Sequence, residues 1–138
     1  MKPIILVVGC PASGKSHVCE AVRGKFLYVP HDLYKEREYP IYLLKGMSKE
    51  KPVIGEIPFG LSKIQTELEG RGAKVIPVFL IEEEKTLHER WDKRKLEKAS
   101  VRTGHLSRQD TYRARAEELG AFLGSAAELI EHLRRMVF

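Results

Sequence analysis

Four short runs of apolar residues recur along the first part of this chain. They cover residues 4–8 (IILVV), 26–29 (FLYV), 52–57 (PVIGEI) and 74–81 (KVIPVFLI). These runs are nearly continuous rather than alternating with polar positions, which is typical of strands buried on both faces of a parallel sheet. The pattern therefore predicts four strands in a mainly parallel sheet.

Helical patterns lie between these runs. Residues 15–24 and 61–69 predict two helices, and residues 83–98 predict a long, charged third one. Strands that alternate with helices form βαβ units with right-handed crossovers. Residues 30–50 break this alternation, and they predict a loop with one or more helical turns.

The C-terminal part of the chain predicts two more helices. Ser107 followed by Asp110 resembles a capping box, which predicts a helix from there to about residue 119. Gly120 and Gly124 interrupt the pattern, and Ser125 is expected to cap a last helix. An apolar stripe on that helix predicts packing against the core. It consists of Leu129, Ile130, Leu133 and Met136. No run in this region is long enough to indicate a fifth strand.

Residues 9–16 read GCPASGKS and match the pattern GxxxxGK[ST] between a predicted strand and a predicted helix. Such a loop turns its backbone amides toward an anion. Lys15 can span the β- and γ-phosphates of a nucleotide, and the Ser16 hydroxyl can ligate Mg²⁺. The loop predicts binding of ATP, or another nucleoside triphosphate, together with Mg²⁺. The predicted nucleotide-binding residues here are Gly9, Cys10, Pro11, Ala12, Ser13, Gly14, Lys15, Ser16 and His17.

Two acidic residues follow predicted strands, where ligands of open parallel sheets bind. Asp32 follows the second strand and can accept a proton from an attacking hydroxyl, or form a local turn or helix cap. Glu56 lies at the end of the third strand. It can bind Mg²⁺ through water, orient Lys35 or the phosphate acceptor, or simply turn to solvent.

Arg90 and Arg94 are four residues apart and share one face of the predicted helix 83–98. Two guanidinium groups after the fourth strand can clamp the nucleotide phosphates and stabilise charge on the transferred phosphoryl group. The alternative is a pair of ordinary helix salt bridges. We expect the first, with Lys15, Asp32 and Arg94 as catalytic residues.

Composition and charge narrow the class of protein. The chain has 138 residues, of which 43% are apolar and 31% charged, which predicts one globular domain over residues 1–138. No apolar stretch is long enough to span a membrane, so a cytoplasmic protein is expected. The net charge of +5 is concentrated in residues 85–115. That segment suits a polyanionic partner, or is a solvated helix of mixed charge.

Two cysteines, Cys10 and Cys19, are expected to be reduced thiols. Cys19 is predicted to be buried on the first helix. In the phosphate-binding loop, backbone amides could lower the pKa of the Cys10 thiol.

Three segments resemble the kinase part of the bacteriophage polynucleotide kinase family. They are MKPIILVVGCPASGKSHVCEAV, FLYVPHDLYK and GAKVIPVFLIEEEKTLHERWDKRK. The resemblance implies that Asp32 is the general base toward a 5′-hydroxyl and that Lys35 stands where the family uses an arginine to hold the acceptor's 3′-phosphate. It also implies that Arg94, assisted by Arg90, contacts the donor phosphates, and that Glu56 supports the base. The stretch between Asp32 and Glu56 is shorter than in the family.

Together these observations predict a three-layer αβα P-loop NTPase fold. The expected sheet has four or five strands in the order 2-3-1-4, with a helical lid over about residues 90–106. The expected function is an ATP-dependent kinase of the 5′-hydroxyl of a DNA or RNA end, with Tyr34, Tyr39 and Tyr42 available for base stacking. The alternatives are a kinase of a small molecule, which the short acceptor region favours, and a non-catalytic nucleotide-binding module.

Overall fold

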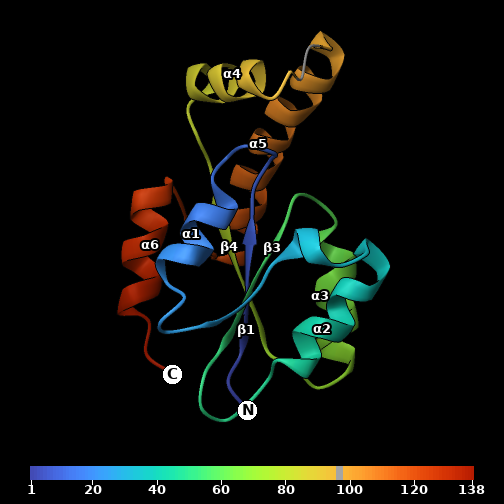
Figure 1. Ribbon diagram of the computed structural model, residues 1–138, viewed down its shortest axis with the longest axis vertical. Helices are drawn as coiled ribbons and strands as arrows, with labels where there is room; N and C mark the ends of the chain where they lie inside the picture. Colours follow the sequence, from blue (N-terminus) through green and yellow to red (C-terminus); the bar gives the residue numbers. More distant parts are fainter. Residues whose placement is uncertain (96–97) are drawn as a thin grey trace.

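The computed structural model describes residues 1–95 and 98–138. Its five strands form an all-parallel sheet in the order β2-β3-β1-β4-β5 (Figure 1). This confirms the predicted α/β class and the order of the first four strands. The fifth strand pairs with the end of β4 and is only two residues long, too short to appear as an apolar run. The strands are β1 (Ile4–Val8), β2 (Leu27–Val29), β3 (Val53–Ile57), β4 (Val75–Leu80) and β5 (Leu123–Gly124).

Helices cover both faces of this sheet. Helices α1 and α6 pack on one face, and helices α2, α3 and α5 contribute to the core on the other, which gives the predicted three layers (Figure 1). Two short 3₁₀ turns, η1 (His31–Leu33) and η2 (Glu36–Glu38), precede α2. The helices are α1 (Lys15–Ala21), α2 (Tyr39–Lys45), α3 (Leu61–Gly70), α4 (Glu84–Lys93), α5 (Ala99–Leu119) and α6 (Ala126–Arg135).

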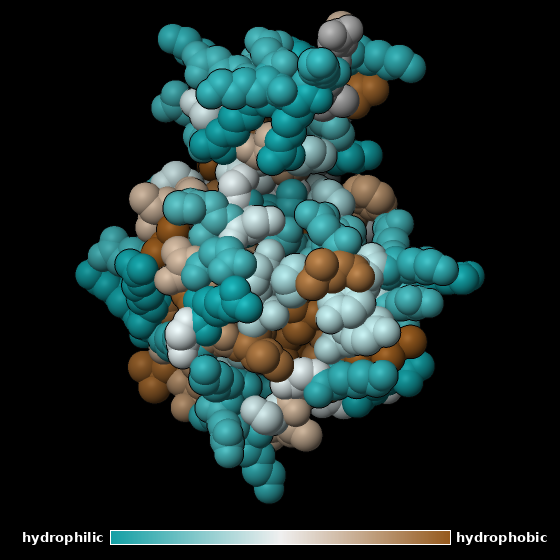
Figure 2. Space-filling view, in the orientation of Figure 1, coloured by the Kyte–Doolittle hydropathy of each residue, from teal (hydrophilic) through white to brown (hydrophobic). Residues whose placement is uncertain are grey.

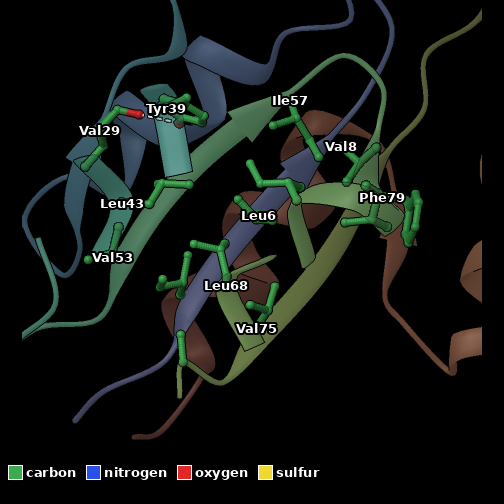
Figure 3. Packing of buried hydrophobic residues seen from close by; sticks show 14 of the residues in the cluster. Leu6, Val8, Val29, Tyr39, Leu43, Val53, Ile57, Leu68, Val75 and Phe79 are labelled. Atoms are coloured by element: carbon green, nitrogen blue, oxygen red, sulfur yellow. Dashed lines mark hydrogen bonds between the residues drawn. The ribbon is translucent and has the colours of Figure 1, made fainter. Parts of the chain in front are cut away.

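The central strand β1 is fully buried, and its successive side chains enter two different cores. Leu6 and Val8 pack with residues from α2, α3 and α5 (Figure 3). Ile5 and Val7 pack against α1 and α6. Burial of each such side chain stabilises the fold by about 1.5–3 kcal/mol, so the strand that leads into the phosphate-binding loop is firmly held.

The last helix forms as the sequence predicts. The Ser125 hydroxyl accepts a hydrogen bond from the backbone N–H of Glu128, and the Glu128 carboxylate accepts one from the backbone N–H of Ser125. Leu129 and Leu133 are fully buried in the core shared with α1. The predicted cap and apolar stripe are therefore confirmed.

Two predicted helix boundaries are wrong. Helix α4 ends at Lys93 instead of residue 98, and Lys95 adopts a left-handed backbone with φ of 57°. Helix α5 begins at Ala99, so Ser107 lies in its interior and caps nothing. No glycine or proline marks the end of α4, so the local pattern could not show it. Residues 96–97, inside the predicted helix and the predicted lid, lie outside the described residues.

Helix α4 and the start of α5 stand beyond the end of the sheet, and hydrophilic side chains cover this end of the molecule (Figures 1 and 2). Several basic residues of segment 85–115 are paired with carboxylates here. The pairs are Arg90–Glu82, Arg102–Asp92, Arg113–Asp110 and Arg115–Glu118. Four of the ten basic residues of this segment are thus paired with carboxylates in the described part of the protein. Among the described helices, none is both long and apolar enough to cross a membrane.

Candidate active site

The loop between β1 and α1 needs its two glycines for different reasons. Gly14 has φ of 106°, a conformation that side chains disfavour. A Cβ atom on Gly9 would lie 2.6 Å from the Ser13 Oγ and 3.2 Å from the Leu80 carbonyl oxygen, so this position lacks space. Ala12 also adopts a left-handed backbone, with φ of 65°, which the sequence does not reveal.

The two side chains of the loop that are predicted to contact the nucleotide and Mg²⁺ form hydrogen bonds within the protein. The Lys15 ammonium donates a hydrogen bond of 3.0 Å to the Cys10 carbonyl oxygen, and the Ser16 hydroxyl donates one of 2.9 Å to the Glu56 carboxylate. Burial lowers the pKa of Lys15; the charge of Arg94 lowers this pKa further, while Glu56 and Asp32 raise it. The fold therefore brings the charges of Glu56, Arg94 and Asp32 to bear on Lys15.

Glu56 is buried, with 5% of its surface exposed, and its carboxylate faces the phosphate-binding loop. The expectation that it could turn to solvent is wrong. Besides Ser16, the Tyr28 hydroxyl donates a short hydrogen bond to this carboxylate. The backbone N–H of Glu56 donates to the buried Tyr39 hydroxyl at 3.0 Å. Tyr28 was missed because nothing in a three-residue strand shows where its side chain reaches.

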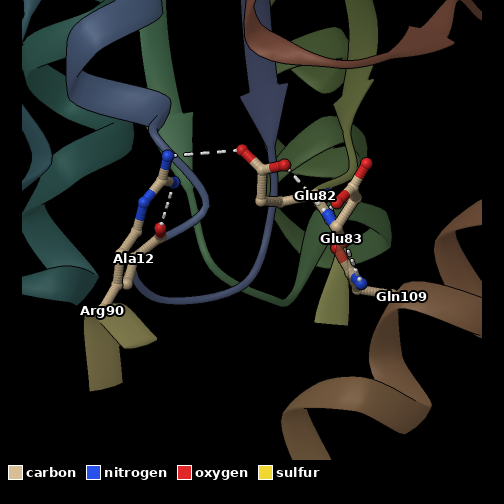
Figure 4. A network of polar contacts seen from close by, with 5 residues as sticks. All are labelled: Ala12, Glu82, Glu83, Arg90 and Gln109. Atoms are coloured by element: carbon tan, nitrogen blue, oxygen red, sulfur yellow. Dashed lines mark hydrogen bonds and ion pairs between the residues drawn. The ribbon is translucent and has the colours of Figure 1, made fainter. Parts of the chain in front are cut away.

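Two side chains of helix α4 form hydrogen bonds to the loop between β1 and α1. Arg90 donates a hydrogen bond of 2.8 Å to the Ala12 carbonyl oxygen and pairs with Glu82 at 3.3 Å (Figure 4). The indole N–H of Trp91 donates to the Pro11 carbonyl oxygen at 2.9 Å. The predicted phosphate-binding role of Arg90 would require it to leave these partners.

Cys10 is fully buried between the loop and α4, where it packs with Leu87 and Trp91. Burial raises the pKa of its thiol, and the opposing effects of Lys15 and of the backbone are smaller. Burial thus outweighs the possible lowering of this pKa by the backbone amides, and the Cys10 side chain is a packing residue. Cys19 is buried as predicted, and burial raises the pKa of its thiol as well.

A cleft of about 570 Å³ opens next to the ends of β2 and β3, between the 3₁₀ turns and helix α3. Its walls are partly apolar and carry charges of both signs. The apolar lining comes from Tyr39, Pro40, Ile57, Phe59 and Ile64, and the charged lining from Glu36, Arg37, Lys63 and Glu67. A cleft of this size and character matches the usual binding sites of small molecules.

The residues predicted to contact the acceptor, Asp32, Tyr34 and Lys35, do not line this cleft. Asp32 is exposed, makes no hydrogen bond to the described residues, and follows His31, which lines the cleft. Tyr34 stacks on Tyr42 with ring centres 3.9 Å apart and does not line the cleft. Lys35 is exposed and is also absent from the lining.

Arg37 and Lys63 were missed by the sequence analysis. Both line the cleft, and neither forms an ion pair with the described residues. Lys63 lies in the first turn of the helix that follows β3, so a search of all strand ends could have found it. Arg37 belongs to a short 3₁₀ turn with no recognisable pattern.

Comparison with solved structures identifies the fold of this chain. A gluconokinase from Sinorhizobium meliloti 1021 matches with a TM-score of 0.62 over 94% of this chain and 87% of its own, at 19% sequence identity. The chain has the P-loop NTPase fold. A de novo designed protein with that fold matches with a TM-score of 0.52 over 97% of this chain and 88% of its own, at 18% identity. A scan of family models and a search of curated proteins found no match, so the resemblance to polynucleotide kinases gains no support from them.

Proposed function

We propose that this protein is a kinase that transfers the γ-phosphoryl group of ATP, or another nucleoside triphosphate, to a hydroxyl of a small molecule. The position of Asp32 carries this proposal. Its neighbour His31 lines the cleft, and its charge acts on Lys15 of the phosphate-binding loop. In the proposed reaction, this carboxylate would accept the proton of the acceptor hydroxyl.

The loop residues fit a nucleotide with Mg²⁺. Lys15 would exchange the Cys10 carbonyl for the β- and γ-phosphates, and Ser16 and Glu56 would hold the cation between them. No group of three or more His, Cys, Asp or Glu side chains among the described residues could hold a metal ion. This suits Mg²⁺, which is commonly held by one or two carboxylates plus substrate phosphates and neutralises their charge.

The cleft favours a small acceptor over a nucleic acid. A polynucleotide end would be expected to follow a positively charged groove, because each nucleotide brings a phosphate. Here Arg37 and Lys63 are balanced by Glu36 and Glu67 in the same lining. The likeness to a gluconokinase, a kinase of a small molecule by its name, agrees with this preference.

The test is a panel of acceptors with ATP radiolabelled in the γ-phosphate. The panel contains sugars, sugar acids, nucleosides, nucleoside monophosphates and oligonucleotides with a free 5′-hydroxyl. We expect transfer to at least one small acceptor and none with Lys15→Ala, which removes the ammonium from the phosphates. Transfer to oligonucleotides alone would instead favour a polynucleotide kinase. ATP binding without transfer to any acceptor would favour a non-catalytic module.

A further inference from the structure

Arg108 lies on helix α5, and its side chain approaches the cleft. Its guanidinium carbon is 5.2 Å from the centre of the Phe59 ring, and Phe59 is a wall of the cleft. Its positive charge also acts to lower the pKa of the Cys10 thiol in the loop, against the larger effect of burial. A single guanidinium group therefore contacts a wall of the cleft and acts electrostatically on the loop.

The part of α5 that carries Arg108 is anchored to the end of the sheet. Gln109, only 4% exposed, accepts a hydrogen bond from the backbone N–H of Glu82 at 2.9 Å and donates one to the Glu82 carbonyl oxygen at 3.0 Å (Figure 4). One turn further along, the Tyr112 hydroxyl donates a short hydrogen bond to the Pro58 carbonyl oxygen. The backbone of Arg108 is thus held in a defined position next to the site.

Arg108 differs from its neighbours in having no anionic partner. Arg113 and Arg115 of the same helix pair with Asp110 and Glu118. Arg108 forms no ion pair or hydrogen bond with the described residues, and its guanidinium group lies against the Phe59 ring. Stacking on an aromatic ring leaves the N–H groups of a guanidinium free to bind a phosphate.

We propose that Arg108 is a catalytic residue that donates hydrogen bonds to the phosphoryl group during transfer. This inference rests on the proposed function. In that reaction the acceptor oxygen forms a bond to the γ-phosphorus while the bond from phosphorus to the β-phosphate oxygen breaks. The hydroxyl proton passes to Asp32, and ADP leaves with the electron pair of the broken bond. Arg108 would stabilise the negative charge on the transferring group, and Phe59 would hold the plane of its guanidinium.

The experiment needs no knowledge of the acceptor. Binding of the fluorescent nucleotide mant-ADP with Mg²⁺ is measured with and without aluminium fluoride, which mimics the transferring phosphoryl group. Wild-type protein should bind more tightly with aluminium fluoride. The Arg108→Ala variant should bind mant-ADP alone as tightly as wild type does. Its gain in affinity on adding aluminium fluoride should be about 10²-fold smaller than that of wild type. Arg113→Ala, an exposed arginine of the same helix, is the matched control and should behave as wild type.

A structural role for Arg108 is separated from a catalytic one by chemical rescue. Free guanidinium ion should restore part of the aluminium fluoride-dependent gain in mant-ADP affinity in Arg108→Ala. It should have no effect on Arg113→Ala. An undiminished gain in Arg108→Ala would overturn the proposal, as would a wild-type protein that binds mant-ADP equally with and without the mimic. Failure of wild-type protein to bind mant-ADP at all is a different result, because it would overturn the proposed function itself.

Discussion

The Tyr39 hydroxyl joins β2 to β3 at the edge of the sheet where the candidate active site lies. The side chain is 1% exposed, and its hydroxyl donates a hydrogen bond of 2.6 Å to the Val29 carbonyl oxygen (Figure 3). It also accepts one of 3.0 Å from the backbone N–H of Glu56. Tyr39→Phe removes one oxygen atom, so two buried backbone groups lose this partner together.

The expected loss of stability follows from those two groups. A buried polar group left without its partner costs about 1–3 kcal/mol. Two such groups, with some relaxation of the short strand β2, give an expected loss of about 2–4 kcal/mol for Tyr39→Phe. This is a large share of the total stability of a typical domain, about 5–15 kcal/mol.

Urea unfolding followed by tryptophan fluorescence measures this loss, because Trp91 is the one tryptophan of the chain and is fully buried. Tyr42→Phe is the matched control. The Tyr42 side chain is half-buried, and its hydroxyl makes no hydrogen bond with the described residues. We expect Tyr42→Phe to change stability by less than about 0.5 kcal/mol. If both variants unfold at the same urea concentration, the Tyr39 hydroxyl does not join the strands as described.

Three further predictions concern catalysis, the last helix and pH. Asp32→Asn should keep the affinity for ATP and lower turnover about 10²-fold; normal turnover with the acceptor found in the panel would remove Asp32 from the mechanism. Ser125→Ala should lower the unfolding free energy by about 1 kcal/mol, because the cap of α6 is lost. Ser107→Ala, inside α5, is its control in the same urea titration and should be close to neutral. Burial lowers the pKa of His132 below its ordinary value of 6.5. The free energy of unfolding should therefore fall as the pH drops below 6.5, because the unfolded chain binds the proton more readily than the folded protein does. In urea titrations repeated across this pH range, His132→Phe should lose less stability than wild type, and an equal decline in both proteins would show that His132 has no part in it.

Local patterns predicted much of the fold and the loop of the candidate site, but not the cleft. An apolar run such as 4–8 indicates burial on both faces, and the GxxxxGK[ST] pattern indicates the loop and the unusual backbone at Gly14. Each depends on residues adjacent in the chain. The cap at Ser125 is local in the same sense. The start of α5 was mispredicted because Ser107 and Asp110 carry a capping pattern that the continuous helix does not use.

The sequence by itself determined the first four strands, the phosphate-binding loop and the carboxylates near it. Only the tertiary structure decided which of these side chains meet. Glu56 reaches Ser16 because β3 lies beside β1, and Arg108 reaches Phe59 because Gln109 binds the turn after β4. Such contacts join residues from separate strands and helices, and no pattern along the chain records them. The cleft is formed in the same way, from two 3₁₀ turns and a helix that are close only in space.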